Sequence, residues 1–180
     1  DLSRGLGDVY KRQHGDLADI VLGSNTSLNI DTGSGNTGAI DIEPQIKGTD
    51  AVVNGNNNKS AVTLDAGLST VRLDNPGGEV IGTDIGAVAI TGSTITITED
   101  ITTNAANIDI TGAFVMEKNA GTITLTTGGG DVAFSSTIDA TTASGTPENL
   151  VITTTGGSVN TGTTIGGSDP VSYTHLTLPT

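Results

Sequence analysis

The chain has 180 residues, no cysteine and a formal net charge of −13 at pH 7. The lack of cysteine excludes disulfides and thiolate sites, and the acidic balance argues against nucleic acid, whose phosphates would repel it. Two phenylalanines and two tyrosines are the only aromatic residues, so a core built from large rings is excluded as well. Gly, Thr, Asn, Asp, Ile and Val dominate instead, a mixture that favours short strands separated by tight turns.

The two ends of the chain are related through their coding DNA. Residues 8–13 can be encoded by a DNA segment whose reverse complement, shifted by one base, encodes residues 170–176. They resemble the translated inverted ends of a transposon-based sequencing adapter. We therefore expect residues 1–13 and 170–180 to be non-native, and residues 14–169 to be an acidic fragment of a longer protein. Because no capping element is visible in the fragment, we also expect bare strand edges at both of its ends.

Strand-like alternation begins early in the fragment. Leu28 and Ile30, and then Ile40 and Ile42, each frame one polar residue, which is typical of a strand with one buried face. The glycines and polar residues at 33–36 predict a turn between them. Gly or Thr interrupts every candidate helical stripe, so the sequence predicts an all-β chain.

The segment 43–60 breaks this alternation. Pro44, Asn54-Gly55 and the three asparagines at 56–58 predict a loop, with a short strand possible at Ala51–Val53. A loop of this length in a repeat array is either a recognition element or an insertion that binds nothing.

A repeat unit follows the loop. Residues 61–73 align with 122–134, and shorter versions occur at 88–92 and 108–112. Units therefore begin near positions 62, 88, 108, 123 and 150, at separations of 26, 20, 15 and 27 residues. Irregular unit length around a constant strand–turn–strand motif is typical of a solenoid, whose turns can lengthen without disturbing the stacked strands.

The clearest repeat runs from 122 to 167 with a period of 27 residues. Ile123, Val132 and Ile138 recur as Leu150, Val159 and Ile165. A fixed period of this size predicts parallel strands stacked coil upon coil around an aliphatic interior, with Thr on the outer face. An antiparallel β-sandwich is the alternative, because short turn-rich strands suit it as well. The predicted inward set is Ile95, Ile97, Ile108, Ile110, Ile123, Leu125, Val132, Leu150 and Ile152.

Segments 130–140 and 149–157 resemble the repeats of very large bacterial surface proteins, such as filamentous haemagglutinin-like adhesins and autotransporter passenger domains. The resemblance covers most of residues 61–169. It implies a right-handed parallel β-helix, export to the cell surface and a role in adhesion or as a stalk. The resemblance is one of composition and repeat spacing, and it includes no catalytic or binding motif.

Three kinds of chemistry deserve consideration. A calcium-binding β-roll requires tandem Gly-Gly-x-Gly-x-Asp units, and segments 128–131 and 82–85 match only pieces of that motif. A polysaccharide-cleaving groove requires clustered acids with a basic partner; stacking could gather Asp109, Asp131 and Asp139, but the pattern places no basic residue near them. Ice binding requires a flat array of Thr rows, and we expect Asp109 and Val151 to interrupt the rows at 94–98 and 122–126 at the equivalent sites.

The sequence therefore predicts no catalytic, cofactor-binding or metal-binding residue. We expect a non-enzymatic structural or adhesive repeat segment of a bacterial surface or secreted protein. Its expected partners are host or cell-surface glycans or proteins, and the neighbouring repeats of the parent chain. The alternative is a non-catalytic part of a carbohydrate-active β-helix protein. No apolar run reaches the roughly 18 residues of a membrane-spanning helix, so a membrane-spanning role is not expected.

Overall fold

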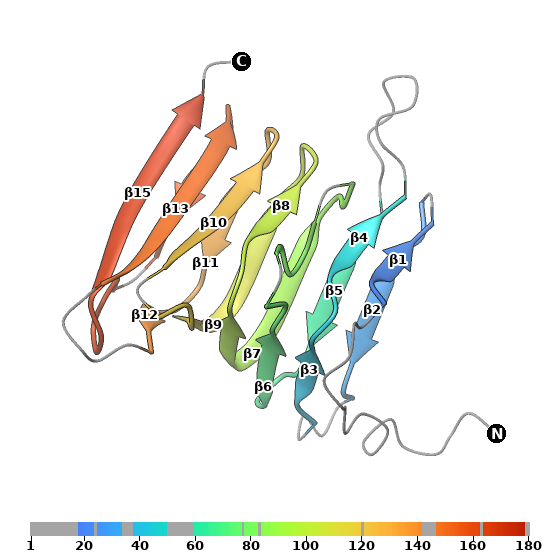
Figure 1. The fold of residues 1–180 in the computed structure, drawn as a ribbon, viewed down its shortest axis with the longest axis horizontal. Coiled ribbons are helices and arrows are strands. Elements are labelled where there is room, and N and C mark those ends of the chain that lie inside the picture. The colour runs from blue at the N-terminus through green and yellow to red at the C-terminus, as the bar shows by residue number, and fades with distance from the viewer. Residues whose placement is uncertain are drawn as a thin grey trace.

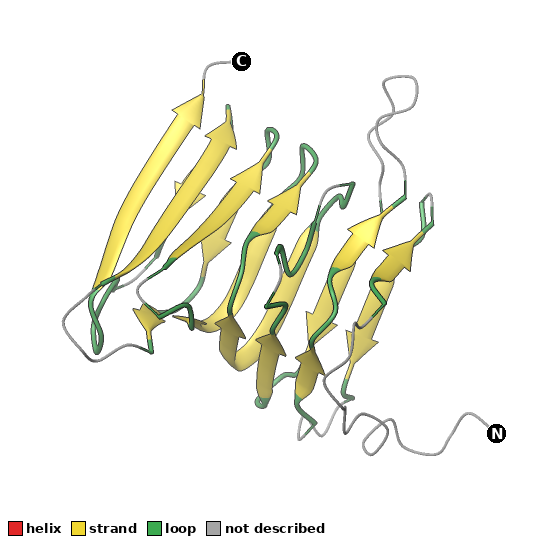
Figure 2. Ribbon diagram, viewed as in Figure 1, coloured by secondary structure: helices red, strands yellow, loops and turns green. Residues whose placement is uncertain are grey.

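Every strand pairing in the described part of the chain is parallel (Figure 1). The computed structural model describes residues 18–23, 25–33, 38–49, 60–76, 78–82, 84–119, 121–141, 147–162 and 164–178. Strands joined by short loops make up these residues, with no helix among them (Figure 2). The chain climbs as a right-handed β-helix, which confirms the predicted fold class and excludes the antiparallel β-sandwich (Figure 1).

The strands are short, and most are bounded by glycine or polar turn residues. In chain order they are β1 Ile20–Leu22, β2 Leu28–Asp31, β3 Ile40–Ile42, β4 Ile46–Gly48, β5 Val62–Asp65, β6 Thr70–Leu73, β7 Val88–Ile97, β8 Ile101–Thr103, β9 Ile108–Met116, β10 Thr122–Thr127, β11 Val132–Phe134, β12 Ile138–Ala140, β13 Glu148–Thr155, β14 Val159–Asn160 and β15 Val171–Leu178.

Each complete rung of the coil contributes to three faces. Face A contains β1, β4, β8, β10, β13 and β15, with Ile81 bridging Ile46 and Ile101. Face B1 contains β2, β5, the first half of β7, the first half of β9, β11 and β14. Face B2 contains β3, β6, the second halves of β7 and β9, and β12, which bridges to Ile165.

Strands β7 and β9 pass without a break from face B1 to face B2. Their register shifts between Thr91 and Thr94, and a bulge of this kind bends a strand. Gly112 lies at the bend of β9 with φ +135°, and an added Cβ atom would lie 1.8 Å from the carbonyl oxygen of Gly92. Only glycine fits this backbone conformation and this close approach between successive rungs.

The interior is a set of aliphatic files that run along the coil axis. Each residue of the predicted inward set is buried, with at most 1% of its surface exposed. Phe114 and Phe134, the only phenylalanines, meet edge to face with ring centroids 5.2 Å apart. A single rung could not bury these side chains alone, so the core exists only because the rungs stack.

The 27-residue repeat is confirmed by the register. Ile123 pairs with Leu150, Val132 with Val159, and Ile138 with Ile165, one partner on each of the three faces. Residues that the repeat made equivalent therefore occupy equivalent places in successive rungs.

The alignment of 61–73 with 122–134 is wrong by one face. Val62 lies on face B1, where its file continues through Val88, whereas Ile123 lies on face A. The next rung after Ile108 begins at Val132, so the predicted 15-residue unit is a change of face and not a rung. All three faces share the same apolar alternation, and pattern alone cannot distinguish them.

The predicted loop at 43–60 is interrupted by a strand. β4 (Ile46–Gly48) pairs with β1, and Ile46 is fully buried. One apolar residue between Gln45 and Lys47 leaves no alternation for sequence analysis to detect. The predicted strand at Ala51–Val53 lies outside the described residues.

The two predicted non-native ends differ in what the structure describes. Residues 1–13 lie outside the described part of the chain. In the C-terminal segment, residues 170–180, β15 pairs with β13 over eight residues. The edge of β13 was predicted to be bare and is instead covered. Such pairing uses backbone groups that any extended peptide offers, and it does not test where residues 170–180 come from.

Candidate functional site

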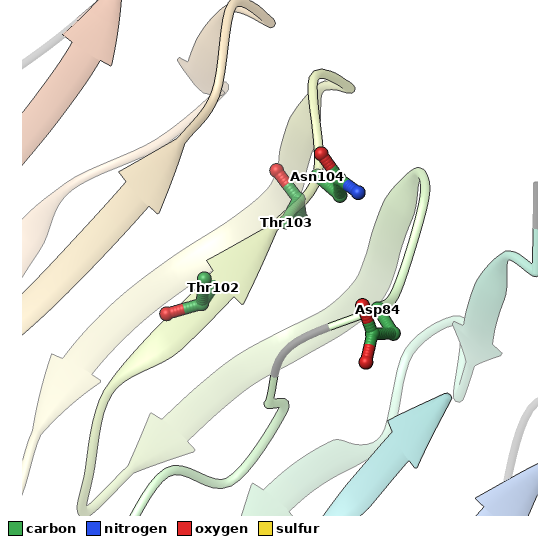
Figure 3. Close-up of a pocket in the computed structure, with 4 residues that line it drawn as sticks. All are labelled: Asp84, Thr102, Thr103 and Asn104. Atoms are coloured by element: carbon green, nitrogen blue, oxygen red, sulfur yellow. The ribbon is translucent and has the colours of Figure 1, made fainter. Parts of the chain in front are cut away.

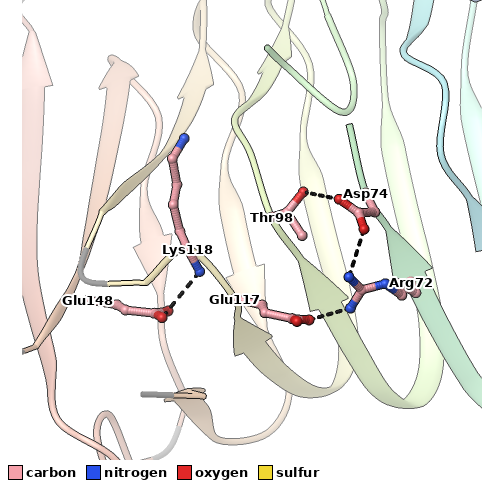
Figure 4. Close-up of polar contacts among 6 residues, drawn as sticks. All are labelled: Arg72, Asp74, Thr98, Glu117, Lys118 and Glu148. Atoms are coloured by element: carbon pink, nitrogen blue, oxygen red, sulfur yellow. Dashed lines mark hydrogen bonds and ion pairs between the residues drawn. The ribbon is translucent and has the colours of Figure 1, made fainter. Parts of the chain in front are cut away.

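Ion pairs lie along the corner between face B2 and face A (Figure 4). Arg72 of β6 donates to Asp74 at 2.7 Å and, through its other terminal nitrogen, to Glu117 just after β9. The ion pair with Glu117 reaches across β7, which lies between β6 and β9. The Thr98 hydroxyl, just after β7, donates to Asp74 at 3.1 Å. This group therefore ties together three rungs and leaves Asp74 with two donors.

The electrostatics of this group favour a fixed cation. The hydrogen bond to Glu117 raises the pKa of Arg72, burial opposes that effect, and Asp74 adds to the increase. An arginine held this way stays protonated at any physiological pH. Its chemistry here is to neutralise carboxylates, and it cannot act as a general acid or base.

The same corner continues along the coil through Lys118 (Figure 4). The Lys118 ammonium pairs with Glu99 of the preceding corner, and the Lys118 backbone N–H donates to Glu148 at 3.2 Å. Glu148 begins β13 and is only 1% exposed. Because a buried carboxylate is costly without donors, the hydrogen bond to the preceding rung is part of what allows Glu148 there.

A second set of polar contacts forms the corner between face A and face B1. Three threonines at or next to the ends of strands of face A are buried, and each hydroxyl donates to the carbonyl oxygen three residues later: Thr103 to Ala106, Thr127 to Gly130 and Thr154 to Gly157. The residue two places after each threonine has positive φ, namely Ala105, Gly129 and Gly156. The threonine hydroxyl and the left-handed residue together turn the chain onto face B1.

These threonines correct the prediction that Thr belongs on the outer face. A sequence pattern common to the three corners could have identified them. In each, Thr is followed three residues later by Gly or Ala, then by a polar residue and an aliphatic residue. That polar residue forms its own ladder between rungs. Asn107 accepts from the N–H of Asp131 at 2.9 Å, and Asp131 accepts from the N–H of Ser158 at 2.7 Å.

A shallow depression lies beside face A. It encloses about 230 Å³ and is lined by Asp84, Thr102, Thr103 and Asn104 (Figure 3). The Thr102 hydroxyl already donates to Glu79 at 2.6 Å, and that of Thr103 to its corner carbonyl. A ligand would therefore meet chiefly the Asp84 carboxylate and the Asn104 amide. The volume is smaller than that of typical small-molecule sites, roughly 300–1,000 Å³.

The three acids considered for a catalytic groove do not share a file. Asp109 lies on face B1 opposite Ala133, and Asp139 lies on face B2 opposite Val115. Asp131 lies at the corner before β11, where it belongs to the ladder between rungs. The suggestion that stacking could gather them is therefore wrong, because the side chains belong to different parts of the rung.

Asp139 has a structural partner instead. Its carboxylate accepts from the backbone N–H groups of Asp169 at 2.8 Å, Ser168 at 3.0 Å and Ala140 at 3.1 Å. Burial alone would raise the pKa of Asp139, but these three donors outweigh it and hold the pKa below its ordinary value of 3.8. The carboxylate therefore stays ionised and fixes the turn that leads into β15.

The pieces of the calcium motif serve other purposes. The segment 128–131 forms a threonine corner, and Asp84, from the segment 82–85, lines the depression with φ 66°. Within the described residues, no group of three or more Asp, Glu, His or Cys side chains is arranged to hold a metal ion. The same part of the chain contains no helix long and apolar enough to cross a membrane.

The threonine rows are narrower than ice binding requires. On face A, Thr126 is flanked by Thr102 and Thr153, but Thr124 is followed by Val151, as expected. On face B2, Thr96 lies between Arg72 and Val115. Asp109 interrupts neither row, because it lies on face B1 opposite Ala89.

Comparison with protein-family models, with curated proteins and with solved structures gave no match. The functional argument therefore depends on the sequence and the geometry described above.

Proposed function

We propose that this chain is a structural segment of a larger bacterial surface or secreted β-helical protein, where it acts as a stiff stalk or spacer in adhesion. The proposal is supported by one observation above all: four of the charged side chains most suited to chemistry are held in contacts between rungs. Arg72, Lys118, Asp131 and Asp139 each bind a neighbouring rung or turn. A surface that reacts with a substrate would need some of these groups to face outward and converge.

The interior supports the mechanical part of the proposal. The buried apolar residues form one core cluster that continues from rung to rung, and each rung is stabilised by the rungs beside it. Bending the coil would separate backbone hydrogen bonds and buried side chains on one side. A stack of this kind transmits force and holds a fixed length, which is what a stalk requires.

The adhesive part of the proposal concerns the outer surface. The depression at Asp84 and Asn104 presents a carboxylate and an amide, groups that hydrogen-bond to sugar hydroxyls or to peptide groups. Glycans or proteins of another cell are therefore the partners we propose. The same depression is the feature that favours the alternative function, a non-catalytic part of a carbohydrate-active β-helix protein.

Two assays on one preparation test these roles. Antibodies raised against the purified chain should label intact cells that express the parent gene, and external protease should remove the label. The chain itself should leave bacterial and plant polysaccharides uncleaved. Labelling that appears only after lysis, or release of reducing sugars, would contradict the proposal. Oligosaccharide binding without cleavage, abolished by Asp84→Ala, would favour the alternative.

A further inference from the structure

The depression at Asp84 and Asn104 results from extra backbone in one rung. The N–H of Thr102 bonds to the carbonyl of Ile81 at 2.9 Å, and the N–H of Asn104 bonds to the carbonyl of Ile85 at 2.7 Å. The step from 102 to 104 is two residues, whereas the step from 81 to 85 is four, so the earlier rung has backbone that leaves the ladder. Such a bulge re-aims the side chains within it, and Asp84 lies there with φ 66°.

The Asp84 carboxylate differs from the carboxylates near it in having no partner within the described chain. It is half-buried, and it comes from the rung that precedes that of Asn104 (Figure 3). Glu79 accepts from Thr102 at 2.6 Å, and Asp100 accepts from a backbone N–H of β10 at 2.8 Å. The side chains of Asp84 and Asn104, by contrast, make no hydrogen bond or ion pair with another described residue. Their acceptor oxygens are therefore available to a ligand that brings donors.

The lining favours a planar cationic group. Calcium takes several oxygen ligands, and the depression offers a single carboxylate. A sugar ring would find no aromatic side chain to stack on among the lining residues. An arginine guanidinium donates two N–H groups to one carboxylate, and the Asn104 carbonyl oxygen can accept a third. The net charge of −13 also attracts cationic partners.

We propose that this depression binds the guanidinium group of an arginine side chain on a protein partner. A volume of about 230 Å³ suits one side chain better than a whole small molecule. Lys47 in the preceding rung pairs with Asp19 at 2.5 Å, which leaves Asp84 to the ligand. The inference rests on the adhesive part of the proposed function for the kind of partner, and it selects proteins over glycans.

The test titrates capped tripeptides into the purified full chain and follows the backbone amides of Thr102 and Asn104 by NMR. The probe is glycyl-arginyl-glycine amide, and its control contains citrulline, which keeps the shape of arginine without the charge. Asp84→Asn removes the charge of the depression, and asparagine also tolerates positive φ. The matched control Asp109→Asn removes the same charge from an exposed position on face B1.

The arginine peptide should bind saturably at these amides, and Asp84→Asn should weaken its binding by about fivefold or more. Asp109→Asn should weaken it by less than about twofold. The inference would be overturned by equal weakening in the two variants, by the absence of saturable binding, or by citrulline or lysine peptides that bind as tightly. Saturable binding of glucose or galactose at the same amides would also overturn it, because the site would then select glycans.

This outcome is separable from that of the cell-labelling experiment. If the chain is displayed on cells but does not bind the arginine peptide, only the arginine site is wrong. If the purified chain binds the peptide but is never displayed, the surface role is wrong and the arginine site stands.

Discussion

At the scale of single residues, the buried threonines matter more than their small size suggests. Thr103, Thr127 and Thr154 each place a hydroxyl inside the coil, where it satisfies a carbonyl of the corner. A buried carbonyl without a donor is expensive, so the hydroxyl and the corner depend on each other. The corner thus gains a directional contact that aliphatic packing could not supply.

Thr127→Val should therefore lower the free energy of unfolding by about 1–2 kcal/mol, because valine keeps the shape but leaves the Gly130 carbonyl without its donor. Urea denaturation measures the change. Thr126→Val is the matched control, since Thr126 points outward and its substitution should change stability by less than about 0.5 kcal/mol. Equal losses in the two variants would show that the corner does not depend on the hydroxyl.

At the scale of elements, the sequence predicted where strands begin more reliably than where they end. Val88 and Ile108 start β7 and β9 as the repeat indicated, but Gly92 and Gly112 do not end them. Glycine usually interrupts a strand; here it permits a bend within one. A close approach between the backbones of successive rungs leaves no trace in the sequence beyond the glycine itself.

The turn that leads into β15 is an element whose stability should depend on pH. Folding favours the ionised form of Asp139, because three backbone donors lower its pKa in spite of burial. Its contribution is therefore complete at pH values above the ordinary carboxyl pKa of 3.8, and it is lost as the pH falls through the lower folded value.

Asp139→Asn should then lower the free energy of unfolding by about 1 kcal/mol at pH 7, a modest loss since solvent reaches the carboxylate. The difference from the unaltered chain should shrink as the pH is lowered below 3.8. Urea denaturation at several pH values measures both effects, with the exposed Asp109→Asn as control. A loss that is independent of pH would contradict the assigned role of the carboxylate.

At the scale of the whole molecule, the repeat predicted the parallel coil and its interior. The 27-residue period and the alternation of Ile123 and Leu125 were sufficient, because stacking follows directly from them. The assignment of strands to faces was beyond pattern analysis, since Val62 on face B1 and Ile123 on face A have equivalent local sequences. Corner contacts such as Arg72 with Glu117 were also missed, because they join residues far apart in the chain whose meeting depends on rung length.

For the candidate functional site, too, the sequence predicted which residues to consider but not where they lie. Sequence analysis identified Asp109, Asp131 and Asp139 as the acids to consider, but only the register shows that they occupy separate parts of the rung. The depression at Asp84 and Asn104 had no sequence signal as a site, since its lining comes from two rungs. Only the stacking of these two rungs brings its lining residues together.

The rung-by-rung climb can be measured directly with spin labels, because the chain contains no cysteine that would compete for labelling. Cysteine replaces Asn160 and, in separate variants, Asn29, Thr63 or Ala89, which lie in one file of face B1. Pulsed electron paramagnetic resonance should give narrow distance distributions between the two labels. The backbones of positions 29 and 160 should lie about 24 Å apart, and the distance should decrease by about 4.8 Å for each rung along the series. Distances that do not decrease in that order, or broad distributions for every pair, would contradict the stacked parallel coil on which the account depends.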